Sequence, residues 1–178
     1  MNFSEPLSGL FHLRAEPRLD ERGSFTRIFS SAHFQELGLC TDFVEWSQSH
    51  NMKAHTLRGV HWQDPPEIKM VHCVRGAIFD VAVDLRRHSP SFGRHYATIL
   101  SAENCDILYI PQGFAHGFQT LEEASTVFYH ISQAYVPDGA CGVRWNDPAL
   151  AIEWPNPHSP IMSKKDETLP LLSEIQVK

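Results

Sequence analysis

Short apolar segments divided by turn-forming residues dominate the middle of the sequence, from about residue 56 to residue 136. The segments are rich in Val, Ile, Phe and Tyr, and the chain between them reads DPP, RG, RRHSPSFG, AENC, PQG and LEEA. Strands that alternate with turns at this spacing are typical of an antiparallel sandwich or barrel. Only two short helices are expected, one over SSAHFQEL near residue 30, where a serine can cap the first turn, and one after MSKKD. The sequence therefore predicts an all-β fold with short peripheral helices.

The length and composition favour one globular domain that covers residues 1–178. No internal repeat, low-complexity tract or linker divides the chain. Hydrophobic residues make up 42% of the chain and charged residues 20%, which is enough apolar material for a buried core. The net charge of -6, without a long basic run, argues against a nucleic-acid partner, although local arginines could bind a small phosphate.

Segments for export or membrane insertion are not expected. The N-terminus lacks a basic start followed by an apolar run, and no apolar segment approaches about 18 residues. The four cysteines, Cys40, Cys73, Cys105 and Cys141, are widely spaced and form no C-x-x-C pair. This spacing suggests neither a zinc knuckle nor a disulfide framework. A reducing cytoplasm is the predicted location.

A lysine interrupts the expected strand EIKMVHCV. Period-two alternation places Lys69 on the same strand face as Val71 and Cys73, while the opposite face is also largely apolar. An unpaired charge inside a sandwich is costly, so an inward lysine needs a partner or a function. The alternative is that Lys69 lies near the strand end and extends its ammonium group to water.

Two histidines stand in similar surroundings. His61 lies within the strand LRGVHWQ, and His116 lies in IPQGFAHGF, where proline and glycine allow a tight turn beside aromatic rings. Each histidine taken singly is more often structural than catalytic. Together with Lys69, Tyr129 and Tyr135 they form a candidate site of polar groups inside an apolar cavity.

A metal centre is one interpretation of these histidines. The segment PQGFAH resembles the second sequence motif of the cupins, whose jelly roll is a double-sheet β architecture. Many cupins hold a metal with an H-x-H pair, a glutamate and a later histidine. Here the pair reads HWQ, so Gln63 replaces one ligand and leaves His61, Glu67 and His116. A three-ligand iron or zinc site with an open position is chemically possible, but the lost imidazole makes it the weaker interpretation.

A longer match favours a metal-free site. In order and spacing, six segments of the chain resemble the dTDP-4-dehydrorhamnose 3,5-epimerase family: LRGVHWQ, KMVHCVRGAIFDVAVDLR, SPSFG, IPQGFAHGFQTLEEAS, VRWNDPALAIEWP and MSKKD. The resemblance extends from DERGSF near residue 20 to about residue 170. It implies a cupin-type double-stranded jelly roll, usually a homodimer, that acts without a cofactor or metal on a nucleotide-linked 4-keto-6-deoxy sugar.

The resemblance also implies a division of labour among four catalytic residues. A 4-keto group acidifies the hydrogens on C3 and C5, so the enzyme needs a base, a cation at the ketone oxygen and an acid on the opposite face of the sugar. His61 matches the base, whose neutral imidazole can accept a proton at physiological pH. Lys69 matches the residue that stabilises the enolate oxygen, and Tyr129 matches the acid, with a nearby lysine easing formation of its phenolate. Asp166 matches the carboxylate that orients the base.

Substrate-binding residues follow from the same resemblance. Arg22 and Arg58 match arginines that meet the nucleotide diphosphate, where a guanidinium can bind two oxygens at once. The full expected set is Arg22, Arg58, Gln48, Asn51, His116, Tyr135 and Lys165. Simple alternation, however, places Arg58 and His61 on opposite faces of one strand. Either a bulge at Gly59 re-aims one of them or they serve the site from different directions.

Two departures from the family pattern concern the nucleotide end. RGSFTR supplies Arg27 where RGxFxE usually supplies a glutamate, and the glutamine about a dozen residues before LRG is replaced, with Glu45 or Gln48 as candidates. The catalytic residues are intact, which argues against a non-catalytic sugar-nucleotide binding module. The identity of the nucleotide and of the 4-keto sugar therefore stays open, as does the choice between C3, C5 and both carbons.

Overall fold

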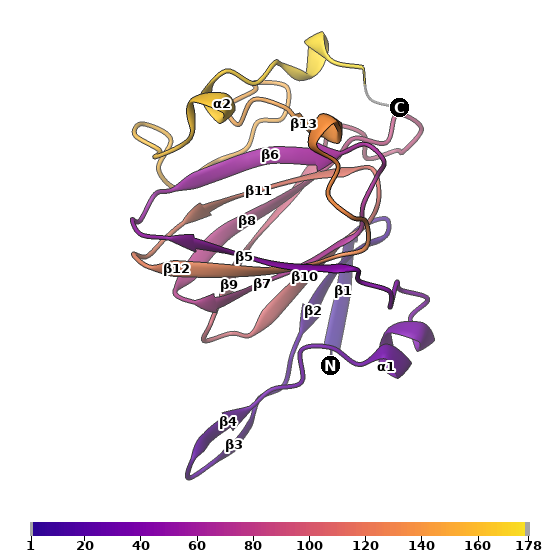
Figure 1. Cartoon of the computed structure of the whole chain (residues 1–178), viewed down its shortest axis with the longest axis vertical. Helices are drawn as coiled ribbons and strands as arrows, with labels where there is room; N and C mark the ends of the chain where they lie inside the picture. Colours follow the sequence, from indigo (N-terminus) through magenta and orange to yellow (C-terminus); the bar gives the residue numbers. More distant parts are fainter. Residues whose placement is uncertain (1, 177–178) are drawn as a thin grey trace.

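Two antiparallel β-sheets pack face to face in the computed structural model, which describes residues 2–176 (Figure 1). The larger sheet has six strands in the order β1 (Asn2–Leu7), β2 (Leu10–Arg14), β10 (Asp106–Ile110), β7 (Lys69–Arg75), β12 (Ser125–Ile131) and β5 (Glu45–Asn51). The smaller sheet has five strands in the order β13 (Ala140–Gly142), β6 (Leu57–Gln63), β11 (Phe114–Thr120), β8 (Ala77–Asp84) and β9 (His95–Ser101). The predicted all-β fold with two facing sheets is confirmed.

Smaller elements surround this sandwich. A hairpin of β3 (Arg18–Asp20) and β4 (Gly23–Phe25) protrudes from it, close to α1 (Ser31–Glu36), and α2 (Lys164–Glu167) lies over β6 (Figure 1). Two 3-10 turns complete the structure, η1 (Pro137–Gly139) and η2 (Leu172–Glu174). The predicted helix near residue 30 is present, and the second helix begins within MSKKD and not after it. The expected serine cap at α1 is wrong, because the side chain of the N-cap residue Ser30 makes no capping hydrogen bond. No helix within residues 2–176 combines the length and apolarity needed to cross a membrane.

The core lies between the two sheets. Val71 and Cys73 of β7 and Val127 of β12 pack in one buried cluster with Ile78 and Ala82 of β8 on the facing sheet. These residues occupy alternate strand positions, as expected when one strand face is turned inwards. Lys69 shares the inward face of β7 with Val71 and Cys73, so its ammonium group enters the space between the sheets.

Loops and tails cover much of the outer faces of the sheets. Phe34 of α1 packs in a buried cluster with Met70 and Tyr109 on the larger sheet, and Trp154 of the C-terminal region packs with Val81 and Val83 on the smaller one. Strands covered on both faces need apolar side chains on both faces. This cover explains why EIKMVHCV is apolar at odd and even positions alike.

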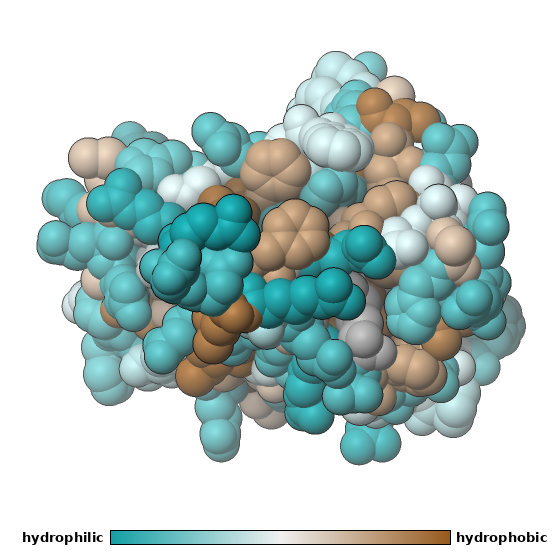
Figure 2. All heavy atoms as spheres, turned by 90° about the horizontal axis from the view of Figure 1, so that it is seen from below, coloured by the Kyte–Doolittle hydropathy of each residue, from teal (hydrophilic) through white to brown (hydrophobic). Residues whose placement is uncertain are grey.

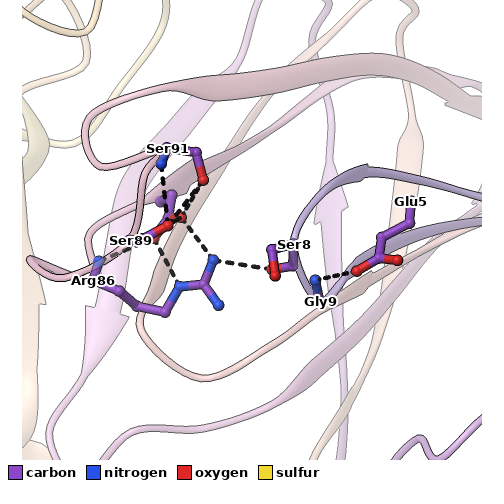
Figure 3. Close-up of polar contacts among 7 residues, drawn as sticks. Glu5, Ser8, Gly9, Arg86, Ser89 and Ser91 are labelled. Atoms are coloured by element: carbon purple, nitrogen blue, oxygen red, sulfur yellow. Dashed lines mark hydrogen bonds and ion pairs between the residues drawn. The ribbon is translucent and has the colours of Figure 1, made fainter.

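A buried carboxylate ties together two turns at one end of the sandwich. Asp84, at the end of β8, accepts hydrogen bonds from Nε (2.9 Å) and Nη2 (2.7 Å) of Arg86 and from the hydroxyls of Ser89 (2.6 Å) and Ser91 (2.7 Å). Arg86 also donates to the carbonyl of Ser8 in the turn between β1 and β2 (Figure 3). Burial raises the pKa of Asp84, but these hydrogen bonds outweigh burial and hold the pKa at about 2. The segment SPSFG therefore serves the architecture of this end.

Candidate active site

A cavity of about 690 Å³ opens between the two sheets. His61 and His116 line it from the five-stranded sheet, Lys69 and Tyr129 from the six-stranded sheet, and Asp166 from α2. The four predicted catalytic residues, which are spread over more than a hundred positions of the sequence, thus meet at one cavity.

His61 and Asp166 form a hydrogen-bonded pair. Nε2 of His61 lies 2.9 Å from Oδ1 of Asp166, whose Oδ2 accepts the backbone N–H of Gly59 at 3.3 Å. The hydroxyl of Ser163, the N-cap of α2, accepts the backbone N–H of Asp166 and fixes it in the first turn. Burial raises the pKa of Asp166, but the bond to His61 and its attraction outweigh burial, so the pKa lies below its usual value. Because a charged carboxylate only accepts, Nε2 carries the proton, and Nδ1 is the nitrogen that can take one.

A bulge in β6 brings Arg58 to the same cavity. In the β6–β11 ladder, His116 lies opposite His61 and Phe118 lies opposite Arg58. An advance of two residues along β11 therefore corresponds to three residues along β6. The extra residue falls near Gly59, which has φ +138°, and a Cβ on it would lie 2.6 Å from Cα of Gly117. Only glycine tolerates this combination of backbone angle and close approach. The first of the two alternatives for Arg58 and His61 is therefore the one that holds.

Lys69 is paired as well as half-buried. Its Nζ lies 2.8 Å from Oε1 of Glu67, and its side chain is only 15% exposed. Extension of the ammonium group to bulk water is thus not how this lysine is accommodated. Glu67 compensates the charge, and the ammonium group remains on the cavity wall.

The three residues of the metal interpretation do not converge. His61 is bonded to Asp166, Glu67 to Lys69, and His116 to Asp80. Within residues 2–176 no group of three or more His, Cys, Asp and Glu side chains is arranged to hold a metal ion.

A second histidine–aspartate pair lies deeper. Nε2 of His116 is 2.8 Å from Oδ2 of Asp80, which is fully buried on β8, and Oδ1 of Asp80 has no hydrogen-bond partner among the described residues. Asp80 is not among the site residues predicted from the sequence. A signal was present, because Asp80 lies between Ile78 and Ala82 on the inward face of an otherwise apolar strand.

Tyr129 stands beside the second pair. Its ring meets the ring of His116 edge-on, with 6.1 Å between the ring centres. Burial, and then the charge of Asp80, raise the pKa of Tyr129, while Arg58 and a hydrogen bond with Ser49 lower it less strongly. Tyr129 therefore keeps its proton at neutral pH, as a donor must. Arg58 is the cation that lowers its pKa.

Asn51 and Gln48 of β5 differ from their expected roles. Asn51 is buried and its Oδ1 accepts from Nε of Arg58 at 2.9 Å, so it orients the arginine instead of lining the cavity. Gln48 also lies outside the cavity lining, whereas Glu45 and Ser47, on the other face of the strand, belong to it. The structure thus places Gln48 away from the cavity of its own chain and Glu45, the other candidate from the sequence, at it.

The remaining expected residues divide into two groups. Tyr135 and Lys165 line the cavity. Arg22 does not, because it follows β3 at the turn of the protruding hairpin, where its side chain is 85% exposed and paired with Asp20 at 2.6 Å. Within residues 2–176 of one chain, no contact brings this arginine to the cavity.

Comparisons with known proteins point to one family. The family model described as dTDP-4-dehydrorhamnose 3,5-epimerase matches residues 4–174. The Escherichia coli K12 protein of that name is 42% identical over 165 residues, 90% of this chain and 89% of the relative. A solved structure of the Bacillus anthracis protein with TDP and PPi bound has a TM-score of 0.92 and 41% identity, covering 95% of this chain and 97% of that one.

A third comparison concerns a sugar nucleotide. A Legionella pneumophila 3,5-epimerase solved in complex with dTDP-4-keto-L-rhamnose has a TM-score of 0.93 and 35% identity, covering 98% of this chain and 94% of that one. These similarities confirm the cupin-type double-stranded jelly roll. With two facing sheets, a His–Asp pair, a lysine and a tyrosine around one cavity, and a family model that spans nearly its whole length, the chain belongs to the dTDP-4-dehydrorhamnose 3,5-epimerase family.

Proposed function

We propose that this protein is an epimerase that inverts C3, C5 or both in a nucleotide-linked 4-keto-6-deoxyhexose, namely dTDP-4-dehydro-6-deoxyglucose or a related sugar nucleotide. One observation carries the proposal: His61 and Tyr129 line the same cavity from opposite sheets. A sugar ring bound between the sheets would have the base on one face and the acid on the other. Inversion requires that arrangement, because the proton must leave from one face and return to the other.

The proposed reaction needs only protein side chains. Nδ1 of His61 takes the proton from C3 or C5, and the electron pair moves onto the ketone oxygen, where the ammonium group of Lys69 stabilises the enolate. The electron pair then returns to carbon, which takes the phenolic proton of Tyr129 on the opposite face. Afterwards His61 releases its proton and Tyr129 regains one, so the protein is unchanged. No carbon is oxidised or reduced overall, and the proposal therefore includes no redox cofactor.

The substrate end of the cavity fits a diphosphate. Arg58 is fixed by Asn51, and Lys165 lies on the cavity wall next to the catalytic Asp166. A guanidinium and an ammonium group are the side chains that suit phosphate oxygens. Together with the thymidine nucleotides seen in the related structures, these cations support a dTDP-sugar as the first substrate to test. The product would serve deoxysugar and polysaccharide biosynthesis.

We also propose that the protein works as a homodimer in which the β3–β4 hairpin reaches a second copy. Leu19 and Phe25 on this hairpin are 81% and 67% exposed, although isolated hairpins rarely carry large apolar side chains into water without a partner. Figure 2 views the molecule from the hairpin side, where apolar side chains lie exposed among polar ones. Trp46 and Val74 of the six-stranded sheet are also exposed. A second copy would cover such surfaces and could bring Arg22 to a neighbouring cavity.

Mixing two inactive variants tests this arrangement. His61→Ala disables the base, and Arg22→Ala disables the hairpin, so heterodimers of the two would contain one cavity with both groups intact. We expect light scattering to give the mass of a dimer and the mixture to regain about a quarter of wild-type activity after subunit exchange. A monomer in solution, or mixing without recovery, would contradict the shared site.

A cytoplasmic location is part of the proposal. It is supported by the cysteines Cys40, Cys73, Cys105 and Cys141, which are all free thiols in the structure. Free thiols persist in a reducing compartment.

Incubation with a panel of 4-keto-6-deoxy sugar nucleotides in deuterium oxide tests the proposed reaction. We expect deuterium at C3, C5 or both, together with an inverted product, and we expect activity to survive a chelator. Binding without exchange would identify a non-catalytic sugar-nucleotide binding module. Stoichiometric iron or zinc, with activity lost on chelation and restored by the metal, would instead establish a metal enzyme that uses His61, Glu67 and His116.

A further inference from the structure

The segment 132–139, which we call the crossover segment, connects the two sheets at the cavity. It leaves the end of β12 in the six-stranded sheet and leads into β13 in the five-stranded sheet. Tyr135, in the middle of this segment, lines the cavity and is 62% exposed. Its position over the cavity is therefore set by a loop and not by a strand ladder.

Two side chains hold the crossover segment from opposite sheets. Oε1 of Glu45 on β5 accepts the backbone N–H of Tyr135 at 2.8 Å. Oε1 of Gln63 on β6 accepts the backbone N–H of Val136 at 2.9 Å, and its Nε2 donates to the carbonyl of Ala134 at 3.1 Å. The backbone of residues 134–136 is thus hydrogen-bonded to one carboxylate and one amide, which come from facing sheets.

The Tyr135 side chain has no comparable tie of its own. Within residues 2–176 its hydroxyl has no hydrogen-bond partner and its ring packs against no other aromatic ring. The backbone bonds to Glu45 and Gln63 are consequently what determines where the ring lies. Both side chains also line the cavity, so the loss of either would loosen the tyrosine at the cavity.

We propose that Glu45 and Gln63 are positioning residues that hold Tyr135 over the cavity, where its ring bounds the bound sugar nucleotide. The inference rests on the proposed function, because it assigns the ring to that substrate. Neither residue touches the reacting carbons in this proposal, and His61, Lys69 and Tyr129 carry the chemistry. Loosening Tyr135 should then weaken substrate binding more than it slows the chemical step.

The chemistry of the two bonds predicts how substitutions will behave. A glutamine at position 45 keeps an acceptor oxygen at the same reach, so Glu45→Gln should preserve the bond to Tyr135, whereas Glu45→Ala removes it. Gln63→Ala removes both of its bonds. Gln63→Glu keeps the acceptor for Val136 but sets a carboxylate against the carbonyl of Ala134, so it should behave like the alanine variant.

Steady-state kinetics and binding measurements test the proposal. We expect Glu45→Ala to raise KM about 3- to 10-fold, the range for one lost hydrogen bond, and Gln63→Ala, which loses two, to raise KM at least as much. For both variants kcat should stay within about twofold of the wild type. Glu45→Gln should restore KM to within about twofold. In a protein that already carries Tyr135→Ala, the Glu45→Ala change should not raise KM further, because Glu45 acts on KM only by positioning the tyrosine. The exposed carboxylate Glu103, changed to alanine, is the control and should leave both constants unchanged.

Three results would overturn the inference. A Glu45→Gln loss as large as that of Glu45→Ala would show that charge and not the hydrogen bond matters. If Glu45→Ala raises KM by the same factor with and without the Tyr135 side chain, Glu45 does not act by positioning the tyrosine. A fall in kcat with unchanged KM would assign Glu45 to the chemical step.

A binding measurement separates this inference from the proposed reaction. Dissociation constants for dTDP-glucose, which lacks the ketone, can be measured by calorimetry on the same variants. If the wild type converts no 4-keto sugar nucleotide, the reaction proposal fails. A Kd that rises in Glu45→Ala, recovers in Glu45→Gln and does not respond in the Tyr135→Ala background would still support the positioning role, and an unchanged Kd would reject it.

Discussion

Nε2 of His61 lies 2.9 Å from Oδ1 of Asp166, although 105 positions of sequence separate the two residues. The pair is fixed from both sides, because the backbone of Gly59 holds the second carboxylate oxygen and Ser163 holds the start of α2. The geometry sets one tautomer of His61 and leaves its other nitrogen for the substrate.

His61→Asn should remove the base and lower turnover by about 10² to 10⁴-fold or more. Nucleotide binding should persist, because Arg58 and Lys165 are untouched. Turnover measured beside calorimetric binding of dTDP checks both statements. Near-normal turnover of a folded His61 variant would remove this histidine from the role.

Asp166→Asn should cost less than the loss of His61. The amide keeps the shape of the carboxylate, but it no longer favours the N–H tautomer at Nε2 and no longer stabilises the imidazolium. We expect turnover to fall while the base remains in place. The turnover of Asp166→Asn and of His61→Asn, measured under the same conditions, checks this order. A larger loss of turnover in Asp166→Asn than in His61→Asn would contradict it.

Tyr129→Phe should separate proton exchange from inversion. The base alone can remove a proton and return one from solvent to the same face, which labels the sugar without changing its configuration. Only the phenolic hydroxyl is deleted, so deuterium should still enter at C3 or C5 while most epimerised product is lost. Parallel losses of label and inverted product, or no loss of either, would transfer the role to Tyr135 or a bound water.

Acid should destabilise the protein through His72. This residue lies on the outer face of β7, where its ring stacks on that of His130 with 5.7 Å between centres and an angle of 17°. Burial, and then the neighbouring His130, lower its pKa from 6.5 to about 4. The unfolded chain therefore binds a proton that the native protein does not, so stability is complete above about pH 6.5 and falls as the pH drops towards 4.

His72→Phe should flatten this part of the pH dependence. One such group changes the free energy of unfolding by at most about 1.4 kcal/mol per pH unit. Urea unfolding at pH 7.5, 6 and 5 measures the slope for the wild type, for His72→Phe and for a control, His158→Gln, at an exposed position. A slope that stays the same in His72→Phe would show that other groups dominate the acid transition.

Asp84→Asn should destabilise the fold without altering the site. The asparagine cannot accept every bond that Arg86, Ser89 and Ser91 now donate, and the half-buried Arg86 loses its counter-charge. We expect a loss of about 2 kcal/mol in the free energy of unfolding at pH 7, since hydrogen bonds to charged groups contribute about 1.5–3 kcal/mol each. Urea titration checks this, and the exposed Asp42→Asn variant should change stability by less than about 0.5 kcal/mol.

Because the Asp84 network lies outside the cavity, KM and kcat of the folded Asp84→Asn protein should match the wild type. The pKa of Asp84 is held at about 2, below the ordinary value of 3.8. Its contribution is therefore complete above about pH 4 and is lost as the pH falls towards 2. Unchanged stability of Asp84→Asn at pH 7 would show that the network contributes little.

The sequence by itself determined the architecture and indicated the inward position of the predicted catalytic side chains. Period-two alternation is a local property of a strand, so the faces of β7 and β12 could be read without knowledge of their partners. This is why the inward orientation of Lys69 was accessible, and why the family motifs located His61 and Tyr129. The short segments between turns likewise determined that the chain would form sheets.

Only the tertiary structure decided which groups meet. Asp80 reaches His116 because β8 pairs with β11, and no local pattern specifies such a partner. The resemblance had named Asp166 as the partner of His61, but only the packing of α2 against β6 sets the 2.9 Å contact between them. Glu45 rather than Gln48 faces the cavity because a shift of one residue turns every side chain of a strand to the other face.

The same physical reason applies to the remaining differences. The bulge at Gly59 re-aims Arg58 because the backbones of β6 and β11 approach too closely for a side chain, and that approach exists only once the strands are paired. The hairpin carries Arg22 away from its own cavity, although its motif resembles that of a substrate-binding arginine. A motif fixes the chemistry that a residue can perform, whereas strand register and packing fix the cavity at which that residue lies.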